Sequence, residues 1–246
     1  IDGIKVNNAG GFFNFADMST DNIDRIEILR GPQSALYGAD AMASVIQIFT
    51  RKGRGLPTAD AYIRGGSFAT IEGGGSVQFG YKNFGLSAAV GATQTDGFLD
   101  INNNYHNVVV SMMADYRVGE WLKFQFSTRC SDSRFSYPTG SSGDRFDPLD
   151  PNQYAETKRV MASPRVEGHV FPWWKQVIQI GYNREKRNSA DPADVGIDNF
   201  GSYHSNTLEE RITANFLSHF GPWRTASAEI LSTLEFAVEH ESFESN

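Results

Sequence analysis

The sequence is poor in cysteine, because Cys130 is the one residue of this type among 246. A single thiol excludes an internal disulfide, so no disulfide framework holds the fold together. The sequence also lacks any run of about 18 apolar residues, which a transmembrane helix would need. Membrane-spanning strands stay open as an interpretation, because they alternate apolar and polar residues and give a weak hydropathy signal.

Positive charge is scarce as well: 22 Lys and Arg stand against 29 Asp and Glu, for a formal net charge of −7. No basic stripe follows the chain, which argues against a nucleic-acid partner. The five histidines lack the spacing of a metal site, and no pair of acidic residues is marked as catalytic. We therefore expect no enzyme activity and no cofactor, and we interpret Cys130 as a small outward-facing residue.

Glycine and aromatic residues are plentiful, with 24 glycines and 13% aromatics. This pairing is typical of many short strands separated by turns. Residues 1–53 differ from the rest and predict a small mixed α/β module. Its expected strands and helical turns are, in order, strand 1–6, a helical turn at 19–22, strand 25–29, a helical turn at 33–37 and strand 45–50.

From about residue 59, segments of roughly 8–14 residues alternate apolar and polar side chains, and they predict about nine strands. Within one of them, Val108, Val110 and Met112 share a face opposite Ser111 and Asp115. Turns between the segments are alternately short and long, which is the pattern of an outer-membrane β-barrel. Tryptophans near the short turns, namely Trp121, Trp173, Trp174 and Trp223, suit an interfacial girdle.

A soluble β-sandwich also alternates in this way. However, the polar face here carries Arg, Glu, Gln and Asn, as a hydrated lumen would, and sandwich turns have no systematic difference in length. The pattern therefore favours a mainly all-β fold, an antiparallel transmembrane β-barrel that encloses the small amino-terminal module. We expect one strand face to contact lipid and the other to line the lumen.

The segment from Ile26 to Met42 resembles the plug signature of TonB-dependent outer-membrane receptors, with the greatest likeness to the vitamin B12 receptor type. Residues 45–50 resemble the last plug strand of that family. Ala43 and Ser44 depart from the pattern, since family members usually have two glycines there. The signature residues matched in this sequence are Arg30, Gly31, Pro32, Ser34, Tyr37 and Gly38.

The resemblance implies that residues 1–53 are the C-terminal part of a plug and residues 54–246 the N-terminal part of a barrel, so that the chain is truncated at both ends. It implies a receptor in the bacterial outer membrane, in contact with its lipid, that takes up a scarce bulky nutrient such as a ferric siderophore or cobalamin. TonB and its inner-membrane energising complex would act through a segment outside this chain. The alternatives are a secreted carbohydrate-active enzyme and a passive porin-like channel, although porins have no such amino-terminal module.

The loop from Asn7 to Phe15 is the candidate substrate site, because aromatic side chains line the sites of large amphipathic ligands. The candidate residues are Asn8, Phe12, Phe13, Asn14 and Phe15. Alternatively, these phenylalanines pack against the barrel wall. We also expect ion pairs between the lumen and Glu27, Arg30, Arg51 and Lys52. Asp144, Asp147 and Asp150 share a long loop and form a candidate calcium site, since calcium prefers oxygen ligands.

Overall fold

The computed structural model describes residues 1–8, 11–32, 41–138, 150–193, 202–224 and 229–246. Among these residues no helix is long and apolar enough to cross a membrane. The elements are the 3₁₀ helix η1 (Phe15–Asp17) and the strands β1 (Ile23–Arg30), β2 (Ser44–Thr50), β3 (Thr58–Gly65), β4 (Ile71–Tyr81), β5 (Phe84–Thr95), β6 (Tyr105–Val118), β7 (Leu122–Ser136), β8 (Tyr154–Phe171), β9 (Trp174–Asp191), β10 (Tyr203–Arg224) and β11 (Glu229–Ser245).

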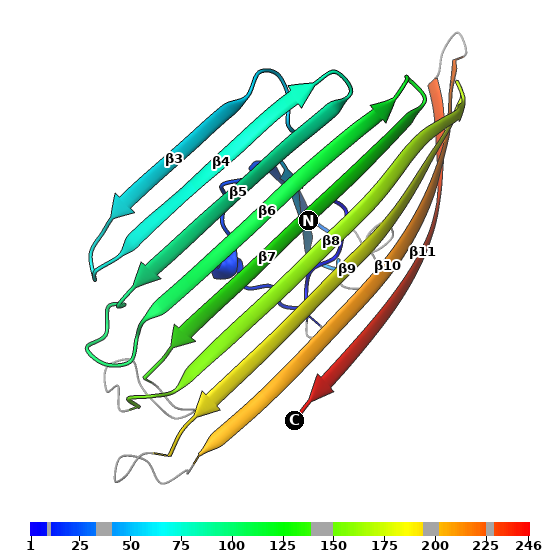
Figure 1. Cartoon of the computed structure of the whole chain (residues 1–246). Helices are drawn as coiled ribbons and strands as arrows, with labels where there is room; N and C mark the ends of the chain where they lie inside the picture. The colour runs from blue at the N-terminus through cyan, green and yellow to red at the C-terminus, as the bar shows by residue number, and fades with distance from the viewer. Residues whose placement is uncertain (9–10, 33–40, 139–149, 194–201, 225–228) are drawn as a thin grey trace.

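The strands form two sheets. β1 and β2 pair as a small antiparallel sheet, and β3 to β11 form one nine-stranded sheet in which each strand pairs with its neighbours in sequence. Figure 1 shows this larger sheet as a curved wall with β3 and β11 at its edges and the amino-terminal segment against one face. The expected nine strands, antiparallel throughout, are confirmed.

The alternating pattern separates the two faces of the sheet as expected. On β6, Val108 and Val110 are exposed, whereas Ser111 and Asp115 are buried. The connections alternate too. Residues 82–83, 119–121 and 172–173 join strands at one end of the sheet, and the longer segments 96–104, 137–153 and 192–202 join them at the other.

The amino-terminal module lies on the polar face. Its apolar core contains Ile1, Ile4, Val6 and Ile48, and Met161 of β8 closes this core from the sheet. Contacts to the module come from strands as far apart as β5 and β11, through Ser87 and Glu239. A small module can touch so many strands only because the sheet curves around it. The polar face, expected to line a hydrated lumen, is therefore largely buried by the module.

Two local expectations for residues 1–53 are wrong. Residues 1–6 do not form a strand, because Asp2 and Gly3 take positive φ values of 51° and 85° and turn the chain. The short helix lies at η1 and not at residues 19–22, because Asn14 provides the cap for Ala16. The expected strands at 25–29 and 45–50 are confirmed as β1 and β2. The helical turn expected at 33–37 lies outside the described residues.

Candidate functional site

The loop that precedes η1 is shaped by its own asparagines. The amide nitrogen of Asn7 donates to the Gly11 carbonyl at 2.8 Å, and the side-chain oxygen of Asn8 accepts from the Phe12 backbone at 2.8 Å. Asn14 caps η1 by accepting from Ala16 at 3.1 Å. Asn8 and Asn14 therefore build the loop that presents the phenylalanines, since short polar side chains bond readily to nearby backbone.

The three phenylalanines of this loop have different surroundings. Phe12 is 75% exposed and Phe15 is 53% exposed, whereas Phe13 is half-buried against the core of the module. Phe13 meets Phe15 edge to face with 4.9 Å between ring centroids. Phe13 therefore packs against the module, whereas Phe12 and Phe15 offer apolar surface. Their contact with a substrate stays a prediction.

Arg159 of β8 supports the packed ring from the wall. Its guanidinium carbon lies 4.5 Å from the Phe13 ring centroid, an arrangement that favours a cation–π interaction. The Nε atom of Arg159 also donates to Glu185 of β9 at 3.0 Å. Both charged side chains are only 12% exposed. The pair therefore holds the aromatic loop at a fixed place on the wall.

Polar side chains from three strands clamp the module through its backbone. Arg129 of β7 donates to the Ser19 carbonyl at 3.1 Å, and Gln179 of β9 donates to the Asp2 carbonyl at 2.7 Å. Arg211 of β10 donates to the carbonyl of Asn7. The two arginines donate charge-assisted hydrogen bonds, which are roughly twice as strong as the neutral bond of Gln179. These three side chains therefore fix the position of the module on the sheet.

The helix η1 has its own support from the wall. The hydroxyl of Tyr105 on β6 shares its one hydrogen between the Ala16 carbonyl at 2.8 Å and the Asp17 carboxylate at 3.1 Å. The amide nitrogen of Asn14 donates to the same carboxylate at 2.8 Å. Asp17 is therefore buried but well bonded, as a buried carboxylate must be.

Glycines let the module approach the sheet closely. A Cβ atom at Gly91 of β5 would fall less than 3.0 Å from Asp21, and one at Gly181 of β9 would fall equally close to Ile4. At Gly53 the obstacle is backbone, because an added Cβ atom would collide with Leu86. Gly53 thus permits the chain to cross β5 as it passes from the module to the sheet.

The charged residues expected to pair with the wall do not all do so. Glu27 bonds to Arg25 at 2.6 Å on the exposed side of β1, and this bond holds the pKa of Arg25 above its ordinary value. Arg30 is exposed, and Arg51 contacts the wall through its backbone carbonyl, which accepts from Ser87. The expected ion pairs are replaced by hydrogen bonds, because the wall side chains bond mainly to backbone atoms of the module.

The signature segment is described in part. Gly31 has a φ of +98°, a conformation that favours glycine, and its N–H donates to the Ala43 carbonyl at 2.9 Å. Gly31 and Ala43 thus continue the β1–β2 pairing by one bond, and Pro32 follows on the exposed surface. Ser34, Tyr37 and Gly38 lie outside the described residues.

The candidate calcium residues are also only partly described, because Asp144 and Asp147 lie outside the described residues. Asp150 is buried, and one of its oxygens accepts from the backbone of Asn152 at 2.9 Å and of Gln153 at 2.8 Å. This arrangement gives Asp150 a structural role at the start of a turn. Calcium binding in this loop stays a prediction.

Comparison with known proteins supports the sequence interpretation. Residues 1–45 match the TonB-dependent Receptor Plug Domain family. The chain is 31% identical over 148 residues to the vitamin B12 transporter BtuB of Vibrio vulnificus, a match that covers 57% of this chain and 24% of that protein. It is 35% identical over 100 residues to BtuB of Photobacterium profundum, covering 40% of this chain and 16% of that protein.

Solved receptor structures share the fold. The pyoverdine outer membrane receptor FpvA from Pseudomonas aeruginosa PAO1 aligns with a TM-score of 0.75 at 14% identity, over 99% of this chain and 41% of the receptor. The ferric-catecholate import receptor Fiu from E. coli K12 aligns with a TM-score of 0.72 at 15% identity, over 90% of this chain and 40% of that receptor. The chain thus spans less than half the length of each of these proteins.

Proposed function

We propose that this chain belongs to a TonB-dependent receptor of the vitamin B12 and siderophore type and covers part of its length. In this proposal the receptor serves active uptake of a bulky, scarce nutrient. Its location is the bacterial outer membrane, and its family consists of transporters and not of enzymes. The observation that carries the proposal is the seating of residues 1–50 on the inner face of a curved sheet through Arg129, Gln179 and Arg211.

In this proposal residues 1–53 act as plug and residues 54–246 as part of the barrel wall. Barrels of about 22 strands have a lumen wide enough to need a plug. The described sheet curves around the module, as a section of such a wall would. Closing the sheet would remove its two edges, which cannot stay unpaired in lipid.

The character of the plug contacts supports gating. The wall holds the plug mainly by hydrogen bonds, such as those of Tyr105 and Gln179, around one small apolar core at Met161. When the plug moves, water can replace the lost hydrogen bonds, whereas separating a wholly apolar interface would expose apolar surface to water. TonB and its inner-membrane complex are the proposed source of the force.

For the substrate we favour a cobalamin-like ligand over a ferric siderophore. The curated relatives at 31% and 35% identity are vitamin B12 transporters, whereas the siderophore receptors resemble this chain at 15% identity or less and support the fold alone. Phe12 and Phe15 offer exposed aromatic surface on the plug, which suits a large amphipathic ligand.

Uptake assays test the function. The full reading frame that encodes this chain is expressed in a Gram-negative bacterium lacking its own receptors, and uptake of radiolabelled cyanocobalamin and of ferric siderophores is measured. We expect cobalamin uptake that is saturable and disappears when TonB is deleted. Uptake that continues without TonB would instead indicate a passive channel and overturn the proposal. Siderophore uptake alone would overturn the choice of ligand.

A further inference from the structure

The outer face of the sheet ends differently at its two rims. At the short-turn end the rim is aromatic: Phe171 stacks on Trp173 with 5.4 Å between ring centroids, and Trp174 stacks on Phe220 at 5.9 Å. At the long-loop end the rim is charged, and its outward-facing residues on β7 to β10 are Asp132, Arg134, Glu156, Lys158, Arg184, Lys186 and Glu210. The apolar band of the outer face lies between these rims, so each rim meets a different environment.

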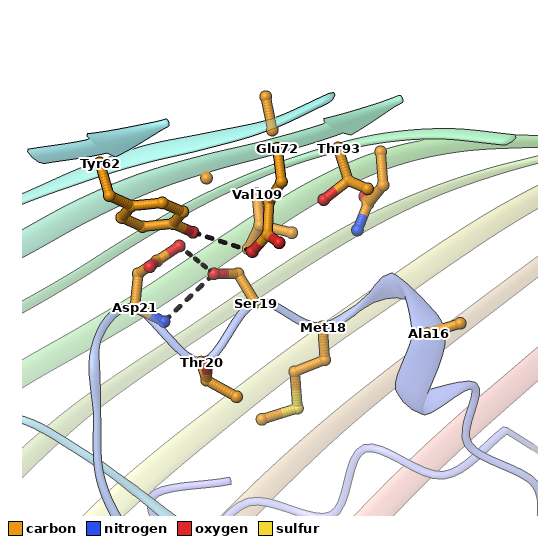
Figure 2. Close-up of a pocket in the computed structure, with 12 residues that line it drawn as sticks. Ala16, Met18, Ser19, Thr20, Asp21, Tyr62, Glu72, Thr93 and Val109 are labelled. Atoms are coloured by element: carbon orange, nitrogen blue, oxygen red, sulfur yellow. Dashed lines mark hydrogen bonds between the residues drawn. The ribbon is translucent and has the colours of Figure 1, made fainter. Parts of the chain in front are cut away.

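The charged rim faces away from the plug. Polar side chains of the inner face are turned towards the plug, as Figure 2 shows for Glu72 of the wall, which faces Asp21 of the plug. Lys158 lies on the other face of β8, which it shares with Val160 at 42% exposure. Lys186 lies opposite Lys158 on β9, and both lysines are exposed. A partner of these lysines therefore approaches from outside the barrel wall.

The strand register brings like charges together on this rim. Lys158 and Lys186 are direct cross-strand partners. Side chains at such positions begin about 5 Å apart, and like charges there repel each other. Arg184 precedes Lys186 by two residues on the same face of β9 and adds a third cation. Positive charge thus gathers on one small area, although the chain as a whole has a formal net charge of −7.

Carboxylates compensate only the margins of this cluster. The ammonium of Lys158 lies 3.2 Å from Asp132 on β7, and the Nε atom of Arg184 lies 3.3 Å from Glu210 on β10. Both pairs are exposed, so water screens them. Among the residues that the structure describes, no carboxylate lies within ion-pair distance of Lys186. The centre of the cluster therefore keeps an uncompensated positive charge.

We propose that Lys158, Arg184 and Lys186 form a docking site for the phosphate group of an outer-leaflet glycolipid. The cluster lies on the lipid-facing side, at the long-loop edge of the apolar band, which is the level of the external headgroups. A phosphate there accepts charge-assisted hydrogen bonds from both opposed lysines and offsets their repulsion. The acyl chains of the lipid would then lie along the exposed side chains of Val160 and Ile180.

The number of cations favours a glycolipid over a phospholipid. A phosphate monoester on a sugar carries nearly two negative charges, whereas the phosphate diester of a phospholipid carries one. Three cations around one position suit the more highly charged group. The site rests on the location of the receptor in the outer membrane and not on the nutrient that it carries, so the uptake assays and the lipid measurements fail or succeed separately.

Lipid binding is measured on the protein from its full reading frame, folded in a nonionic detergent. Fluorescent lipid A is the probe, and the same lipid without its phosphate groups is the comparison. We expect saturable binding of lipid A and at least about tenfold weaker binding of the dephosphorylated lipid. Lys158→Gln and Lys186→Gln should each weaken lipid A binding about fivefold, which is the usual contribution of one basic residue at an anionic lipid surface.

Two further variants separate the cluster from general charge effects. Lys82→Gln removes a positive charge from a short turn at the opposite rim, so its affinity for lipid A should equal that of the wild type. Asp132→Asn releases Lys158 from its carboxylate, so its affinity should rise about threefold. A fall in affinity in Asp132→Asn would contradict the proposed role of Lys158.

Three other results would overturn the proposal. One is equal binding of lipid A with and without its phosphate groups. Another is an equal loss of affinity in Lys82→Gln and Lys186→Gln, which would show that the receptor attracts anionic lipid through its overall charge. The third is tighter binding of phosphatidylglycerol than of lipid A, which would make an anionic phospholipid the occupant of the site.

Discussion

The two faces of the nine-stranded sheet invert the arrangement of a soluble protein. The inner face buries polar side chains, with Ser111 3% exposed and Arg129 7% exposed, whereas Val110 on the outer face is 51% exposed. In water such an outer face would be a large apolar patch, and lipid is the environment that makes it favourable. The inner face is covered by the plug, which contacts it chiefly through hydrogen bonds.

Shortening one methionine on each face should have very different effects. Met161 is 2% exposed in the plug core, so Met161→Ala should destabilise plug docking by about 2–5 kcal/mol. Met112 lies half-buried on the outer face, where lipid can fill the space that Met112→Ala leaves. Urea unfolding in detergent micelles, together with protease sensitivity of the plug, measures both. Equal losses would contradict the assigned roles of the faces.

Adding a charge to each face sharpens the comparison. Val110→Arg places a cation on the outer face at mid-strand and should cost about 2–4 kcal/mol in lipid. Gln125→Arg is the control, because Gln125 is a half-buried polar residue on the inner face of β7. Folding into lipid vesicles, followed by urea titration, gives both values. A smaller cost at Val110 than at Gln125 would reverse the assignment of lipid and lumen.

The crossing at Gly53 tests how tightly plug and sheet meet. Gly53→Ala drives a Cβ atom into the backbone of Leu86, which cannot rotate away, so we expect a loss of about 1–3 kcal/mol. Gly65→Ala is the matched control, since no atom lies within 4 Å of the added Cβ atom there. Thermal unfolding of both variants in detergent measures the two losses of stability. A Gly53→Ala variant as stable as the wild type would mean that the chain passes β5 less closely than the structure shows.

The sequence predicts the sheet well because strand alternation is a local signal. The faces of β6 and β7 follow directly from the residues at alternate positions. The same signal misleads at residues 1–6, where Ile4 and Val6 alternate with polar residues but serve the plug core. Long-range contacts override local preference there, since the Asp2 N–H donates to Ile48 and the Asp2 carbonyl accepts from Gln179.

The plug contacts could not be predicted in the same way. Arg129, Gln179 and Arg211 bond to backbone atoms that lie 110, 177 and 204 residues away in the sequence. Alternation indicates that these side chains face inward, but it does not indicate which plug carbonyl each one reaches. The composition of the loop from Asn7 to Phe15 predicts a candidate substrate site. The division of its phenylalanines into packed and exposed rings depends on contacts that the composition does not indicate.

That division supports the prediction with the smallest effect on stability. Phe12→Ala removes a ring that is 75% exposed, so the free energy of unfolding should change by less than about 0.5 kcal/mol. Phe13→Ala removes a ring that packs on the plug core beneath Arg159, and it should cost about 1–2 kcal/mol. If the exposed ring meets substrate, Phe12→Ala should still weaken cobalamin binding about tenfold, as the loss of an aromatic anchor does. Equilibrium binding of cyanocobalamin to the protein from its full reading frame measures this, with urea unfolding of the same preparations as the second readout. Unchanged affinity in Phe12→Ala would remove this residue from the substrate site, and a loss of stability equal to that of Phe13→Ala would show that the ring is packed and not presented.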